Sequence, residues 1–307
     1  MIAVITTGGT IASRKTEGVA EPVLDGGDLL EGVAHLAQFR VRNLMMKDSA
    51  TLRLADMQAI SDAIKEEFRT PDIRGVIVLH GTDSMEETSF LVELQQRDLR
   101  PVVFTGAQFT ADHERSDGPA NIQLAVRTVL DWSPEDDSNA TGGNVRVVFG
   151  DSVFVPRGLY KASTDSEYAF AQFNPGGPMT RLPDSDVSGI RVDVVAVPPG
   201  SDSVHIDASI AAGARGIVLA CPGSGNSTPE VVDAVRGHVS NGIAVIVTSR
   251  VPQGLLSPIY GGGGGGHDLV EAGAIYSHFL RSSQARILLA ALLASDADRE
   301  EIRRAFG

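Results

Sequence analysis

The chain contains a single cysteine, Cys221, and this scarcity excludes two kinds of architecture. One cysteine can form neither an intrachain disulfide nor a cysteine-based metal cluster. Because Cys221 lies in an apolar run over residues 216–222, we expect it to be a buried, unreactive thiol.

Long apolar runs and targeting signals are also missing. No apolar run approaches the roughly 18 residues of a membrane-spanning helix. The first residues lack a basic segment followed by a hydrophobic stretch of about 7–15 residues, as a secretory signal would have. We therefore expect a cytoplasmic protein without a membrane partner.

Positive charge is scarce as well. The 26 Lys and Arg side chains against 39 Asp and Glu give a formal net charge of -13, with no basic stripe. This balance disfavours nucleic acids and anionic membranes as partners and favours a small-molecule substrate.

A chain of 307 residues has also reached the size at which single hydrophobic cores split into separate ones, which predicts two domains.

Short apolar runs rich in β-branched residues alternate with segments of helical period, which predicts an α/β fold with parallel strands and crossover helices. One helix is expected around Met57, Ile60 and Ile64, a second after a capping box formed by Ser84 and Glu87, and a third after residues 117–119. The expected strands are Ala3–Thr6, Gly75–His80, Val102–Thr105, Val145–Phe149, Val192–Val197, Gly216–Ala220 and Ile243–Thr248.

A polar, turn-rich segment over residues 182–189 precedes a new alternation of strand and helix. Such a composition is typical of a linker. We therefore predict an N-terminal catalytic domain over residues 1–185 and a C-terminal domain over 190–307.

Two expected strands are followed by residues that can carry chemistry. The first strand leads into Thr6-Thr7-Gly8-Gly9-Thr10, and the second into His80-Gly81-Thr82-Asp83-Ser84. The carboxyl ends of parallel strands meet at one sheet edge, where α/β proteins place their ligands. Alone, the first segment would equally suit a phosphate loop or a plain turn, and the second a helix cap. A dinucleotide-binding glycine fingerprint is absent after the first strand.

Together the two segments resemble the bacterial L-asparaginase and glutaminase-asparaginase family. Its members carry Thr-Gly-Gly-Thr-Ile-Ala near the N-terminus and His-Gly-Thr-Asp-Thr-Met-Glu-Glu-Thr farther on, and here only Ser84 departs from the second motif. The resemblance continues through Thr105–Gln108, Ser116–Pro119, Pro222–Asn226 and Ser249–Pro252. It implies a larger N-terminal domain with a doubly wound, mostly parallel sheet and a smaller flavodoxin-like C-terminal domain.

The resemblance also implies a reaction. Thr10 would attack the side-chain amide of asparagine, giving a β-aspartyl enzyme and ammonia, and Thr82, Asp83 and Lys161 would be further catalytic residues. A lysine ammonium beside a hydroxyl favours the alkoxide, which supports a pairing of Lys161 with Thr82. His80, a possible general base, is expected to be structural.

Substrate contacts follow from the same resemblance. Asp83 would bind the α-ammonium group, Ser49 the α-carboxylate, and the backbone carbonyl of Ala107 the leaving amide. Backbone N–H groups near Gly9 and Thr82 are separate candidates for the oxyanion hole, because a glycine turn and a helix start both present unsatisfied donors. No metal and no organic cofactor is implied. The family implies a homo-oligomer, either a tetramer or a dimer, and the preference for asparagine or glutamine stays open.

The sequence departs from the family at three places. Val23 stands where the family has a tyrosine on the mobile loop after the nucleophile, here residues 13–27, and Ala50 replaces a glutamine. The acidic residue usually donated by a neighbouring subunit has no clear match near Tyr260. We predict that a neighbouring subunit supplies Tyr260 instead, the alternative being that Tyr260 packs on its own domain. The glycine run 261–266 is either a flexible loop or a close approach to a ligand or subunit.

Two rival functions remain. An archaeal amidotransferase subunit that feeds ammonia to charged tRNA would need an added N-terminal domain, and the first strand at Met1 argues against it. A binding or regulatory protein could keep the cleft without turnover, but the joint presence of Thr10, Thr82, Asp83 and Lys161 favours an enzyme.

Overall fold

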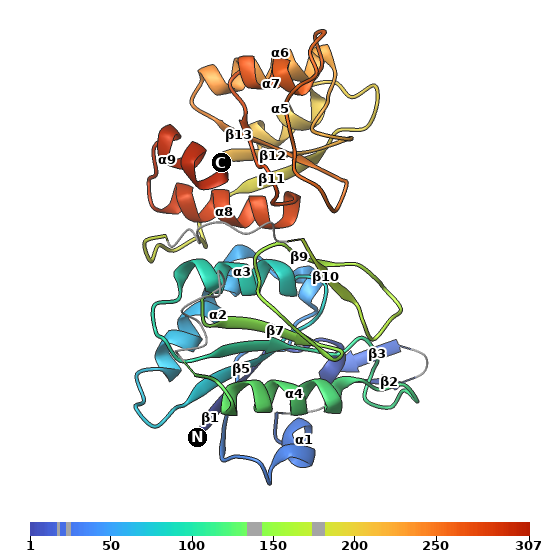
Figure 1. The fold of residues 1–307 in the computed structure, drawn as a ribbon, viewed down its shortest axis with the longest axis vertical. Coiled ribbons are helices and arrows are strands. Elements are labelled where there is room, and N and C mark those ends of the chain that lie inside the picture. Colours follow the sequence, from blue (N-terminus) through green and yellow to red (C-terminus); the bar gives the residue numbers. More distant parts are fainter. Residues whose placement is uncertain (17–18, 23–25, 134–142, 174–181) are drawn as a thin grey trace. The chain divides into compact units, whose positions relative to one another are not determined.

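The computed structural model describes residues 1–16, 19–22, 26–133, 143–173 and 182–307 (Figure 1). The chain divides into two compact units, of which the first contains residues 1–172 and the second residues 182–307. Val23 lies outside the described residues. None of the helices in these ranges is both long and apolar enough to span a membrane.

A six-stranded sheet forms the centre of the first unit, with the strand order β4-β1-β5-β6-β7-β8. All neighbours are parallel except the final pair, β7 and β8. The strands are β1 (Ile2–Thr6), β4 (Phe39–Asn43), β5 (Gly75–Leu79), β6 (Val102–Thr105), β7 (Val145–Phe149) and β8 (Ser152–Phe154).

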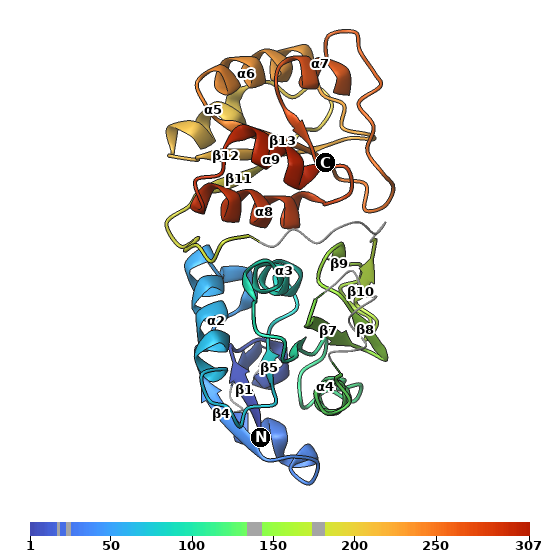
Figure 2. The ribbon, with the colours of Figure 1, turned by 60° about the vertical axis from the view of Figure 1, so that its left-hand side comes forward.

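Helices cover both faces of this sheet, because its inner strands are apolar on both sides (Figures 1 and 2). In β1, Ala3 and Ile5 pack in the core on one face, with residues of α2 (Leu54–Glu67) and α3 (Met85–Gln95). Ile2 and Val4 pack on the other face, with residues of α4 (Gly118–Leu130) and of the 3₁₀ turn Thr10–Ala12.

Smaller elements surround this layered core. They are α1 (Gly26–Leu30), the β2–β3 hairpin (Ser13–Thr16 and Val19–Pro22), the antiparallel β9–β10 ribbon (Leu159–Lys161 and Phe170–Gln172), and 3₁₀ turns at Thr10–Ala12, Glu31–Val33 and Ser49–Thr51.

The second unit has a parallel four-stranded sheet in the order β11-β12-β13-β14. Ile206, Val231 and Leu269, from three of its helices, share one core with the sheet. Cys221 is buried at the end of β12, and burial raises the pKa of its thiol to about 12, as expected for an inert group. The elements are β11 (Val192–Ala196), α5 (Val204–Ala211), β12 (Gly216–Cys221), α6 (Pro229–Ser240), β13 (Ala244–Ser249), α7 (Gly266–Glu271), β14 (Ile275–Tyr276), α8 (Ser282–Ala294) and α9 (Arg299–Phe306).

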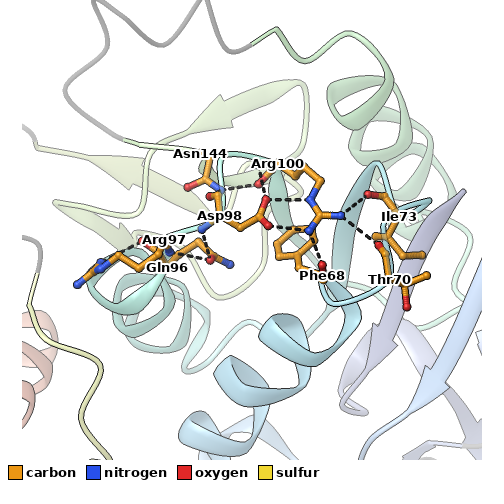
Figure 3. Close-up of polar contacts among 8 residues, drawn as sticks. All are labelled: Phe68, Thr70, Ile73, Gln96, Arg97, Asp98, Arg100 and Asn144. Carbon is orange, nitrogen blue, oxygen red and sulfur yellow. Dashed lines mark hydrogen bonds and ion pairs between the residues drawn. The ribbon is translucent and has the colours of Figure 1, made fainter.

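An arginine network fixes the turn between α3 and β6 (Figure 3). The Arg100 guanidinium pairs with the Asp98 carboxylate at 2.6 Å, donates to the Ile73 carbonyl at 2.9 Å and stacks over the Phe68 ring. The hydrogen bond from Arg100 holds the pKa of the Asp98 carboxyl below the ordinary value. The Asn144 amide donates to the Asp98 carbonyl at 2.7 Å. These bonds lie at the amino end of β6 and stabilise the sheet edge opposite the strand ends that carry Thr10 and Thr82.

The predicted α/β class is confirmed, and all seven expected strands are present within one or two residues. The expected capping box at the start of α3 is wrong in one respect. Ser84 is the N-cap residue, but its side chain makes no capping hydrogen bond. Its hydroxyl instead donates to the Ser49 carbonyl at 2.7 Å.

Candidate functional site

The Thr10 segment and the Thr82 segment meet where the strand order of the first sheet reverses. From β1 the chain crosses to β4 on one side and then to β5 on the other. Such a switch point opens a crevice at the carboxyl ends of the strands. Gly9 packs so closely on Gly81 that a Cβ at Gly9 would lie 2.6 Å from the Gly81 Cα. The residues that follow, Thr10 and Thr82, therefore leave from neighbouring points at the carboxyl ends of the strands.

The turn that carries Thr10 is held firmly by its own backbone. Gly8 and Gly9 have φ of 99° and 86°, which only glycine adopts without strain. The Ser13 hydroxyl donates to the Gly9 carbonyl at 3.0 Å, and Ile11 is buried in the core. Thr10 itself is half-buried. Because these contacts fix the turn, the Thr10 hydroxyl is held in place at the edge of the sheet.

Lys161 lies within hydrogen-bonding distance of two predicted site residues. Its Nζ donates to Thr82 Oγ1 at 2.7 Å and to Asp83 Oδ1 at 2.7 Å. The side chain of Lys161 is 19% exposed and that of Asp83 is 53% exposed, so the pair lies at the mouth of the site. Thr82 is buried, and the adjacent ammonium would stabilise its alkoxide.

Ser49 joins the same cluster from the 3₁₀ turn after β4. Its hydroxyl accepts the Asp83 backbone N–H at 3.2 Å, and its carbonyl accepts the Ser84 hydroxyl. A Cβ at Gly81 would lie 2.5 Å from Ser49 Oγ, so this approach requires glycine. Ser49 is thereby fixed beside Asp83.

Ala107 lies buried in the loop after β6, and α4 fixes that loop. The Asp117 carboxylate accepts the backbone N–H groups of Gln108 at 2.9 Å and Phe109 at 3.0 Å. Asn121 donates to the Gly106 carbonyl and to Asp117, each at 3.0 Å. Sequence reasoning treated Asp117 only as the start of a helix and missed this anchoring, which no local pattern signals.

His80 directly follows β5 and is completely buried. Its Nδ1 lies 2.7 Å from the Gly81 carbonyl, and its edge faces the Phe104 ring. Complete burial lowers the pKa of the imidazole from 6.5 to about 4. Such a ring is a poor proton acceptor near neutral pH, which supports the structural role expected for it.

The glycine run of the second unit packs tightly against its own chain. A Cβ at Gly265 would lie 2.0 Å from the Tyr260 carbonyl, and one at Gly266 would lie 2.1 Å from Tyr276 Oη. Close approach therefore explains these two glycines. Tyr260, which precedes the run, is 57% exposed, and Leu255 and Ile259 of the same segment are 65% and 73% exposed.

Within the described residues, His, Cys, Asp and Glu form no group of three or more that could hold a metal ion.

Besides Asp117 and Asn121, a third residue was missed by sequence reasoning. The Glu86 carboxylate accepts the Lys161 backbone N–H at 2.6 Å. Its place in the second motif was the only available signal.

Two family models together match almost the whole chain. The model described as "Asparaginase, N-terminal" covers residues 1–190, and that described as "Glutaminase/Asparaginase C-terminal domain" covers residues 191–306.

Individual relatives match over comparable lengths. A probable L-asparaginase of Deinococcus radiodurans is 34% identical over 99% of this chain and 96% of its own length. An L-asparaginase of Bacillus licheniformis is 30% identical over 96% of this chain and 95% of its own length. The crystal structure of a probable cytoplasmic L-asparaginase from Campylobacter jejuni superposes with a TM-score of 0.85 and 26% identity, covering 99% of this chain and 98% of that one.

Proposed function

The chain belongs to the asparaginase family, and we propose that it hydrolyses the side-chain amide of L-asparagine to L-aspartate and ammonia, with Thr10 as the nucleophile. One observation carries the proposal most directly. Lys161 Nζ lies 2.7 Å from both Thr82 Oγ1 and Asp83 Oδ1, at the sheet edge where Thr10 also emerges. An ammonium, two hydroxyls and a carboxylate at one crevice suit nucleophilic attack on an amide of a zwitterionic amino acid.

In the first half of the reaction, Thr10 Oγ forms a bond to the amide carbon and the carbon–nitrogen bond breaks. The proton lost by Thr10 leaves with the nitrogen as ammonia. Thr82, hydrogen-bonded to Lys161, is placed to pass that proton. Backbone N–H groups at the Gly9 turn and at Thr82 hold the negative charge that develops on the amide oxygen. Water then hydrolyses the aspartyl ester and restores Thr10.

Substrate binding uses the other side of the cluster. Asp83 pairs with the α-ammonium group, since a carboxylate accepts hydrogen bonds through both oxygens while Lys161 contacts Oδ1. Ser49 binds the α-carboxylate next to it. The fixed loop around Ala107 supplies a backbone carbonyl to the leaving amide.

Ammonia release from purified protein tests this function. With asparagine as substrate we expect turnover, which Thr10→Ala and Lys161→Met reduce by about 10³ or more without unfolding the protein. Retention of more than about a tenth of wild-type activity in a folded variant would exclude the assigned roles. Parallel assays with glutamine measure the preference between the two amides. Asparagine and glutamine differ by one methylene group, which is worth about 1–3 kcal/mol in a binding pocket. If the protein bound asparagine but released no ammonia, it would be a binding or regulatory protein instead of an enzyme.

We propose further that the enzyme works as a cytoplasmic homo-oligomer, a dimer or tetramer in which a neighbouring subunit places Tyr260 near Thr10. Tyr260 is exposed on its own unit, beside the exposed Leu255 and Ile259, and a phenol can relay a proton. Tyr260→Phe should lower kcat by roughly 10² while the oligomer persists. Tyr168→Phe is the matched control, because Tyr168 is 58% exposed. Wild-type kcat in Tyr260→Phe, or a monomeric active enzyme, would refute this arrangement.

A further inference from the structure

The strand that carries Lys161 is joined to the main fold by packing rather than by strand pairing, since Leu159 and Phe170 of its ribbon are buried in the core of the first unit. β9 has three residues and pairs only with β10, in a two-stranded ribbon separate from the six-stranded sheet. Two-stranded ribbons are marginally stable on their own. Lys161 itself lies at the partly exposed end of β9. Its Nζ has to stay within hydrogen-bonding distance of Thr82, so a contact made at Lys161 itself would help to position it.

A carboxylate on α3 makes that connection. Glu86 Oε2 accepts the backbone N–H of Lys161 at 2.6 Å. Glu86 is the second residue of α3, directly after the segment that contains Thr82 and Asp83. A hydrogen bond to an ionised acceptor is roughly twice as strong as a neutral one. The start of α3 therefore contacts Lys161 at two points, its backbone through Glu86 and its ammonium through Thr82 and Asp83.

We propose that Glu86 is a positioning residue, which holds β9 so that Lys161 Nζ stays between Thr82 Oγ1 and Asp83 Oδ1. The inference rests on the proposed function. Because the helix start is rigid, the two contacts fix both ends of the lysine relative to Thr82. Without Glu86 the backbone N–H of Lys161 loses its partner at the end of β9, and the ammonium spends less time beside the hydroxyl that it activates.

A simpler role for Glu86 would be to stabilise α3 by placing negative charge at its N-terminus. Glu87 serves as the control for this role, because it is the other acidic residue in the first turn of α3. A helix-charge effect predicts similar losses for Glu86→Ala and Glu87→Ala. Positioning of Lys161 predicts a loss of turnover for Glu86→Ala alone.

The experiment compares Glu86→Ala, Glu86→Gln and Glu87→Ala by steady-state asparagine hydrolysis. A displacement of about 1 Å in a reacting group costs up to 10²-fold, so we expect Glu86→Ala to lower kcat by about 10- to 10²-fold with KM nearly unchanged. Glu86→Gln keeps an acceptor oxygen for the Lys161 N–H and should recover most of kcat. Equal losses in Glu86→Ala and Glu87→Ala, or an effect on KM alone, would overturn the inference.

A second readout does not depend on the reaction. Hydrogen–deuterium exchange at the Leu159–Lys161 backbone should be faster in Glu86→Ala than in wild type, and near wild type in Glu86→Gln and Glu87→Ala. Unchanged exchange in Glu86→Ala would refute the positioning contact. If wild-type protein released no ammonia while the exchange pattern held, the proposed function would fail and the contact would stand.

Discussion

Replacing Asp117 by alanine is expected to destabilise the first unit by roughly 2–4 kcal/mol. Asp117 is only 8% exposed, and its carboxylate accepts the backbone N–H groups of Gln108 and Phe109. Alanine leaves both donors without this partner, at about 1–2 kcal/mol each in a site that water reaches partly. Asn121 keeps its bond to the Gly106 carbonyl and adds little to the loss.

Denaturant unfolding followed by tryptophan fluorescence measures this loss. Trp132 is the only tryptophan of the chain and lies in the first unit, so its signal reports on that unit. Asp131→Ala, at the other end of α4, is the control and should change the free energy of unfolding by less than about 0.5 kcal/mol. Asp117→Asn keeps one acceptor oxygen and should lie between the two. A loss below about 1 kcal/mol in Asp117→Ala would refute the anchoring role.

Two further predictions follow from burial and charge. The pKa of His80 is about 4 in the folded protein against 6.5 ordinarily, so only the unfolded chain gains this proton between those values. The free energy of unfolding should therefore fall by about 3 kcal/mol as pH drops from 6.5 to 4, and this part of the slope should vanish in His80→Gln. An identical slope in the variant would contradict it. Asp83→Asn should raise KM and lower kcat, because the α-ammonium loses a charged partner. Unchanged steady-state kinetics in this variant would show that Asp83 does not bind the substrate.

Most of the strands predictable from sequence are buried on both faces, and the edge strand β11, whose burial alternates, is an exception. Continuous β-branched runs such as Val102–Thr105 mark central parallel strands, whatever surrounds them. β4 was missed because it is an edge strand in which Arg40 and Arg42 interrupt any apolar run, and Val41 between them is itself exposed. β9 was missed because three residues carry no measurable period. The position of Lys161 therefore came from the family resemblance alone.

The site itself was only partly predictable, for a related reason. The comparisons confirm the predicted family, and strand order explains how residues distant in sequence, such as Ser49 and Asp83, come together. Contacts that depend on the direction of one side chain have no sequence signature. Ser84 bonds to the Ser49 carbonyl rather than capping its helix, and Glu86 bonds to Lys161, because tertiary partners compete with local ones.

The central claim, that Thr10 becomes acylated, is tested most directly by rapid acid quenching of enzyme with asparagine, followed by peptide mass analysis. The account predicts an adduct with the mass of asparagine less ammonia on the peptide that contains Thr10. The adduct should be absent from folded Thr10→Ala protein. An adduct located at Thr82, or ammonia release by Thr10→Ala near the wild-type rate, would contradict the account.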